Sequence, residues 1–184
     1  MTGRDQYSAL RSLRRYLGLL LPAPWDVQYI RREPQLRPLA VVRLVGPRVT
    51  TGSAYVRRFT QNVEVFAYPS GLESDVAASE VEAQQVADLI LRAFDSGSVL
   101  AGGYSMRVPF FDYSGIAPQD VLEPDAEPFD YLVLSNLSGA VRQDPETDDL
   151  YTVMVDLQVG WSDDGDTRRF SGTPLSYVAA SYQP

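Results

Sequence analysis

Acidic side chains crowd one short stretch of the sequence. Asp144, Glu146, Asp148 and Asp149 fall within six residues, and Asp156 follows in the next apolar segment. Carboxylates at this spacing can act as a general acid and base, or they can hold Mg²⁺. The same composition is typical of a solvated hairpin tip, and we favour that interpretation over a carboxylate-dependent enzyme.

Two other segments resemble ligand-binding loops only in part. The run DDGD at 163–166 lacks the spaced third ligand and the closing glutamate of a calcium-binding EF-hand. The run LAGGYS at 100–105 is rich in glycine, but no lysine follows it, so it does not fit a phosphate-binding P-loop. We expect neither segment to bind a metal or a cofactor.

Three residue types that carry much enzyme chemistry are absent. The 184 residues include no Cys and no His, and all 16 basic residues are Arg, so there is no Lys. Without them the chain cannot build Ser-His-Asp or Cys-His nucleophilic sites, Schiff bases or the usual zinc sites. The sequence therefore predicts a protein that is not an enzyme, with no catalytic residues, no metal ligands and no cofactor.

Charge is unevenly distributed along the chain, whose net charge is −8. Residues 1–70 hold 11 arginines against 4 acids, a balance of +7, whereas residues 71–184 hold 5 arginines against 20 acids, a balance of −15. Because the arginines are spread over several predicted elements, we do not expect recognition of duplex DNA. Arg57 and Arg58 point to opposite faces of their predicted strand, which leaves one of them available to a partner's carboxylate.

A helix is predicted at residues 4–21, where leucines recur at helical spacing. Thr2 and Asp5 have capping-box-like spacing at its start, and Pro22 stops it. We expect this helix to cover a sheet. The apolar run at 17–25 is too short for a secretory signal or a membrane span, so we expect the protein to stay in the cytoplasm in which it is made.

Apolar and alternating runs predict six strands. Three fall in the first half, at 25–33, 39–46 and 55–68, and residues 46–54 are expected to form an exposed arm between the second and the third. The other three are predicted at 104–113, 130–144 and 150–162. In the last of these, one face should be buried; it carries Val153, Val155, Leu157 and Val159.

A central helix is predicted at about 74–95, with Gly97 just beyond its end. The glycines and prolines of about 95–130 predict a long irregular segment. The Asp164-Gly165 pair is a turn signal and predicts a further hairpin. The predicted order is α-β-β-β-α-β-β-β over a single domain, 1–184. It indicates an α+β fold whose mostly antiparallel sheet is flanked by the N-terminal and central helices.

This order of elements resembles the tail terminator (tail-completion) proteins of long-tailed bacteriophages, of the siphophage type. The resemblance rests on the runs LAVVRLVG, VEVFAYPS and EVEAQQVADLILRAF and on the long closing hairpin, and it covers roughly residues 4–162. It implies a ring, typically of six subunits, that caps the head-proximal end of the tail tube in the virion. Such a ring ends tube polymerisation and joins the tail to the head connector.

The resemblance also implies partners. These are other copies of the chain, the tail-tube protein and a head-connector or head-closure protein. DNA would pass through the lumen without specific binding, which suits a surplus of acid. A ring interface is heterologous, so we expect some of Arg43, Arg48, Arg57 and Arg58 to contact acids of the neighbouring subunit.

Two alternative interpretations stay open. The first is another neck or tail component, either a head-closure ring subunit or the tail-tube protein itself. A tube protein polymerises into tubes, whereas a terminator stops at a closed ring. The second, more remote alternative is an enzyme that uses the carboxylates near Asp148 and Asp149 with Mg²⁺.

Overall fold

The structure is a computed structural model. It describes residues 5–21, 23, 25–29, 38–52, 56–69, 76–100, 106–117, 122–143 and 151–164. The predicted hairpin loop at 145–149, the residues after the Asp164-Gly165 turn signal and the capping candidate Thr2 lie outside this part of the chain.

The elements follow the predicted order. The helices are α1 (Gln6–Leu20) and α2 (Val76–Leu100). The strands are β1 (Asp26–Gln28), β2 (Leu39–Gly52), β3 (Val56–Tyr68), β4 (Met106–Phe110), β5 (Asp130–Gln143) and β6 (Tyr151–Asp164).

The strands form one sheet in the order β1-β2-β3-β6-β5-β4. Strand β1 runs parallel to β2, and every other neighbouring pair is antiparallel. The predicted α+β class and mostly antiparallel sheet are therefore confirmed.

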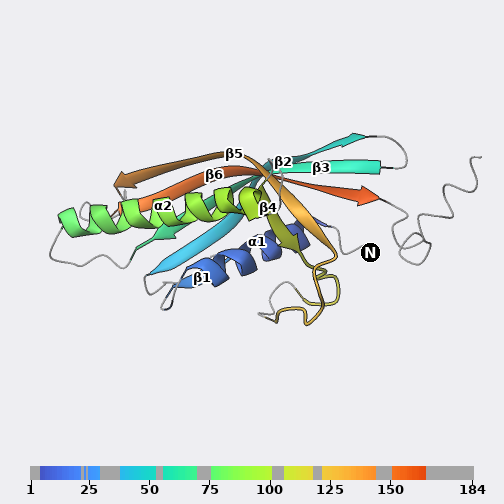
Figure 1. Cartoon of the computed structure of the whole chain (residues 1–184), viewed down its shortest axis with the longest axis horizontal. Helices are drawn as coiled ribbons and strands as arrows, with labels where there is room; N and C mark the ends of the chain where they lie inside the picture. Colours follow the sequence, from blue (N-terminus) through green and yellow to red (C-terminus); the bar gives the residue numbers. More distant parts are fainter. Residues whose placement is uncertain are drawn as a thin grey trace, which may run out of the picture.

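Both helices lie on the same side of the sheet, as Figure 1 shows. Helix α2 packs on β4, β5 and β6, and α1 packs on β1, β2 and β4. The apolar face of β6 is buried against them as predicted, with Val153, Val155, Leu157 and Val159 all nearly inaccessible to solvent. Neither α1 nor α2, the helices of the described residues, covers the opposite face of the sheet, and we call it the open face.

Helix α1 begins one turn later than the capping prediction implied. Asp5 is itself the N-cap, and its side chain accepts a 2.7 Å hydrogen bond from the Ser8 backbone N–H. Leu10, Leu13 and Leu17 are buried as the helical spacing indicated.

The prediction of an exposed arm at 46–54 was wrong in part, because β2 continues through most of it. The pairing of β2 with β3 shifts register between Val45 and Val49 and then resumes as far as Gly52. Gly46 has a φ of +69°, which a glycine adopts without a side-chain penalty. A bulge therefore forms there, and the strand does not end. The segment is exposed, as expected, but it is a strand of a long hairpin.

The central helix also extends beyond its predicted end. Gly97 lies inside α2, which ends at Leu100. A glycine in a helix interior costs only about 1 kcal/mol, and the burial of Ile90 and Phe94 against the sheet outweighs that cost. The irregular segment predicted at 95–130 is therefore shorter, since it also contains β4.

Strand β5 bends sharply and gives the sheet its curl. Its pairing with β6 runs from Gln143–Tyr151 to Val133–Gly160, with a register shift between Ser135 and Ser138. The bend includes Asn136, whose φ is +53°. The first part of β5 pairs with β4, so β5 and β6 diverge toward one end, as Figure 1 shows.

One face of the sheet is buried under the helices and the other is open, so a hydroxyl should have a different effect on each face. Val155→Thr buries a hydroxyl among apolar side chains, because Val155 is 0% exposed. It should lower the free energy of unfolding by about 1–3 kcal/mol. The matched change Val49→Thr, at a residue 53% exposed, should stay within about 0.5 kcal/mol. Urea unfolding measures both, and equal losses in the two variants would refute the assignment.

Candidate functional site

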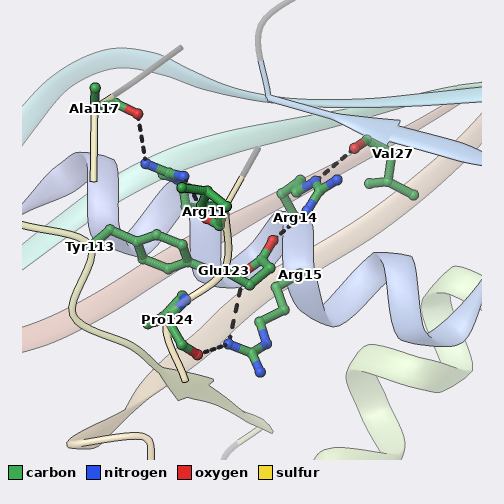
Figure 2. Close-up of polar contacts among 9 residues, drawn as sticks. Arg11, Arg14, Arg15, Val27, Tyr113, Ala117, Glu123 and Pro124 are labelled. Carbon is green, nitrogen blue, oxygen red and sulfur yellow. Dashed lines mark hydrogen bonds and ion pairs between the residues drawn. The ribbon is translucent and has the colours of Figure 1, made fainter. Parts of the chain in front are cut away.

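A cluster of three arginines on α1 forms the most extensive polar contact in the described part of the chain. Arg11 is only 4% exposed and donates to three backbone carbonyls, those of Ile116 (3.3 Å), Ala117 (3.2 Å) and Leu122 (3.0 Å). Its guanidinium also lies 4.4 Å from the ring centroid of Tyr113. Figure 2 shows Arg11 reaching from α1 into this loop. We call the segment 111–124 the clasped loop.

Arg14 and Arg15 hold the same loop through Glu123. The Arg14 guanidinium makes an ion pair with the Glu123 carboxylate, and its Nε donates to the Val27 carbonyl at 2.8 Å. The Arg15 guanidinium lies 3.8 Å from Glu123 and donates to the Pro124 carbonyl at 3.1 Å. Both contacts with Glu123 join residues more than 100 positions apart in the chain.

The Tyr113 hydroxyl donates a hydrogen bond to the same Glu123 carboxylate. Burial, together with the hydrogen bond and the negative charge of Glu123, raises the pKa of Tyr113 above its usual value. Tyr113 therefore stays protonated and keeps donating throughout the physiological pH range.

Two serines of α1 complete the contact. Ser12 Oγ accepts a 3.0 Å hydrogen bond from the Phe111 N–H, and Ser8 Oγ accepts a 3.4 Å hydrogen bond from the Tyr113 N–H. The Arg15 guanidinium lies 4.0 Å from the Phe111 ring centroid. Because arginine has no basic form at neutral pH, this cluster offers no general base apart from Glu123, which Arg14 already holds. These contacts anchor the clasped loop to α1.

The predicted interface arginines lie in two places on β2 and β3. Arg43 is directly opposite Glu64, and its guanidinium donates to the Glu64 carboxylate at 2.6 and 2.8 Å. It also lies 4.5 Å from the Phe66 ring centroid. Arg43 therefore has a carboxylate partner within its own chain, which the sequence analysis did not anticipate.

Arg48, Arg57 and Arg58 lie together at the far end of the β2–β3 hairpin. Arg48 is exposed, with its guanidinium 4.5 Å from the Phe59 ring centroid. Arg57 is exposed and pairs with Asp163 in the β3–β6 register. Arg58 is exposed on the open face, which makes it the predicted arginine best placed for a partner.

The candidate carboxylates are only partly described. Asp156 lies on the open face directly opposite Glu64, next to the Arg43 ion pair. Asp144, Glu146, Asp148 and Asp149 lie outside the described residues. Within the described part of the chain, no group of acidic side chains is arranged to hold a metal ion.

The side chains of the open face form successive rows of different polarity, and each row crosses the strands. An apolar row crosses it, formed by Val41, Phe66, Met154 and Ala140. A charged row and then a polar row follow; in the polar row Gln158 donates to Asn62 and accepts from Asn136, both at 3.3 Å. Where β5 and β6 diverge there is an open hollow of about 470 Å³, and Arg58 lies on its wall.

The short strands β1 and β4 end the described sheet, and each covers only part of the long strand beside it. Strand β1 covers only Leu39–Val41 of β2, and β4 covers only Asp130–Leu134 of β5. Among the described strands, the rest of β2 and the rest of β5 therefore border the sheet on opposite sides. The bulges in β2 and β5 limit how far another strand could pair along either one.

No protein-family profile matches the chain, and no curated protein matches it in sequence. Neither α1 nor α2 has an apolar stretch of the length that a membrane crossing requires, as far as the described residues go.

Sequence reasoning missed the clasped loop. Arg11 and Arg15 lie off the leucine stripe of α1, where solvent exposure is the usual expectation, yet Arg11 is buried. The available signal was the pair Ser8 and Ser12, four residues apart and interleaved with these arginines. Small hydroxyls in this position permit a backbone to approach the helix.

Removal of the Arg11 guanidinium should detach the clasped loop. Arg11→Met leaves three carbonyls of partly buried hydrogen bonds without their donor, so the free energy of unfolding should fall by about 2–4 kcal/mol. Arg92→Met is the control, since Arg92 is 80% exposed and forms only an i,i+4 pair with Asp88. It should cost less than about 0.5 kcal/mol. Urea unfolding measures both, and limited proteolysis should show new cleavage within 111–124 only in Arg11→Met. Arg11→Met with unchanged stability and cleavage would contradict the anchoring role.

Proposed function

We propose that this protein is a tail terminator subunit of a long-tailed bacteriophage. Copies form a ring, typically of six subunits in the family that the sequence resembles, on the head-proximal end of the tail tube. The ring ends tube polymerisation and joins the tail to the head connector, and DNA passes through it without specific binding. The protein is a structural component of the virion and not an enzyme.

The observation that carries the proposal is the pair of long sheet edges. The edges on β2 and β5 are different surfaces on opposite sides of one sheet. Contact between the β2 edge of one copy and the β5 edge of the next is heterologous, and heterologous contacts close into rings when the rotation permits. A two-fold dimer would need one edge to meet itself.

The distribution of charge supports the same head-to-tail order. Arg48 and Arg58 lie on the β2–β3 hairpin at one end of the sheet. At the other end of β5 and β6, residues 144–150 connect the paired Gln143 and Tyr151, and this connection contains four acids. Asp163 and Asp164 also lie at the arginine end. The exposed arginines still make that end the less acidic of the two, which favours contact between unlike ends over contact between like ends.

The described chemistry is also consistent with a structural role. The largest polar cluster anchors a loop, and the chain contains no Cys, His or Lys. A head-closure ring subunit or the tail-tube protein fits the same sheet, and these are the alternatives. An enzyme that uses Mg²⁺ on the acids near Asp148 and Asp149 is a more distant one.

Reversal of one exposed charge tests whether neighbouring subunits meet through unlike surfaces, with Arg58 at the contact. Arg58→Glu should weaken assembly several-fold at low salt, because an attractive contact of about 0–1 kcal/mol becomes repulsive. Arg92→Glu makes the same change of charge on the outer surface of α2 and should leave assembly unaltered. Sedimentation velocity over a salt series measures both, and the difference should shrink as salt rises. Equal assembly of the two variants at low salt would remove Arg58 from the interface.

Tail-tube growth separates the terminator from its alternatives. Purified protein added to growing tubes should stop their extension at amounts well below one copy per tube subunit, because one ring blocks one end. Tube length in electron micrographs is the measurement. Incorporation along the whole tube would identify a tube protein, and no effect on length would favour a head-closure protein.

A further inference from the structure

The hollow on the open face combines apolar walls that solvent reaches with an arginine. Tyr131 and Val133 of β5 are 51% and 43% exposed, although both are large apolar side chains within a strand. Arg58 lies on the wall, and no ion pair joins it to another described residue. Asp130 also lines the hollow, but its carboxylate accepts a 2.8 Å hydrogen bond from the Tyr131 N–H.

Gly160 helps to open this space. It lies on β6 between Thr60 and Val133, and it has no side chain to fill the gap between them. The resulting volume of about 470 Å³ falls within the range of about 300–1,000 Å³ that binding pockets occupy. The hollow is therefore large enough to receive several side chains of a partner.

Another surface of the same chain has complementary chemistry. Residues 125–129, which we call the acidic link, lead from the clasped loop into β5 and contain no helix or strand. Asp125 and Glu127 are exposed, and a proline on either side of them restricts the backbone toward extended conformations. An extended segment with prolines loses little conformational entropy when it docks on an aromatic wall such as Tyr131.

Contacts at both ends hold the acidic link on the helix side of the sheet. The residue before it, Pro124, accepts a 3.1 Å hydrogen bond from Arg15 of α1. At its other end the Phe129 N–H donates to the Phe110 carbonyl at 3.0 Å, and the centroids of these two rings lie 4.6 Å apart. The link, between β4 and β5 in Figure 1, supplies none of the residues that line the hollow. These contacts keep it away from the hollow of its own chain, so a second copy is the occupant that fits.

We propose that the acidic link of one copy docks in the hollow of the next. Its carboxylates pair with Arg58, and its alanine and proline side chains lie against Tyr131 and Val133. The hollow and the link are different surfaces, so the contact is heterologous, as a ring requires. This inference rests on the proposed assembly of copies through unlike surfaces, and it names the acids that Arg58 meets.

Exchange of the two charges tests the pairing. Arg58→Glu should weaken assembly at low salt, and the addition of Glu127→Arg or of Asp125→Arg should restore most of it in at least one case, because the pair is rebuilt with opposite polarity. The control adds Glu80→Arg instead, which makes the same change of net charge at an exposed residue of α2 and should restore nothing. Sedimentation velocity measures all of these variants.

The outcomes separate this contact from the proposed function. If the parent forms rings and neither link variant assembles better than the Glu80→Arg control, the contact is overturned and the ring stands. A parent that stays monomeric at all concentrations would overturn both.

Engineered disulfides locate the contact, since the chain contains no native cysteine. Protein with Val133→Cys is mixed with protein carrying Ala126→Cys, and the control mixture replaces the latter with Val81→Cys, at an exposed residue of α2. The first mixture should form disulfide-linked dimers at least about tenfold faster, because docking holds its two thiols at a millimolar effective concentration. Non-reducing electrophoresis measures the rates, and equal rates in the two mixtures would overturn the proposal.

Two further results of the same assay would also overturn it. Dimers that form as fast in Val133→Cys protein alone would indicate a two-fold contact between like surfaces. An intramolecular disulfide in a chain that carries both Val133→Cys and Ala126→Cys would show that the link docks within its own copy.

Discussion

The side chains of β3 and β6 alternate between the two faces of the sheet, and the rest of the structure depends on this alternation. These two strands form the centre of the sheet, and Val65 lies directly opposite Val155 on the face that both helices cover. Because successive side chains alternate between faces, burial of this row fixes the chemistry of the opposite row. The open face consequently carries Glu64, Asp156 and Gln158, and a slip of one residue would bury all three.

The sheet edges and the clasped loop take their positions from the central strands β3 and β6. Strands β1 and β4 are short, so they leave most of β2 and β5 at the border of the sheet. The loop that leads from β4 to β5 crosses α1 instead of extending the sheet, and Arg11 satisfies three of its carbonyls. A buried guanidinium without these acceptors would be costly, so the loop and the helix stabilise each other. The same bend of β5 that carries its first part toward β4 opens the hollow beside Gly160.

Local patterns predicted the element order, the antiparallel class and the buried face of β6, since these depend on periodicity within one segment. They failed at glycines, because a glycine can either end a strand or helix or lie within it. Gly46 and Gly97 indicated breaks, but the first forms a bulge within β2 and the second lies within α2. Of the candidate site, the sequence predicted that one of Arg57 and Arg58 would be available to a partner, and both are exposed. The internal partner of Arg43 depends on the β2–β3 register. The Arg11 contacts join residues 105 to 111 positions apart. The pair Ser8 and Ser12 indicates only that a backbone can approach the helix, and it does not identify the segment that does so.

The central claim is that unlike edges of this sheet meet in a closed ring. Electron microscopy of the purified protein, with averaging of the particles to a resolution that traces strands, tests it most directly. The account predicts closed rings in which the β2 edge of each copy faces the β5 edge of its neighbour. Monomers at all concentrations, or a two-fold dimer joined through like edges, would contradict it.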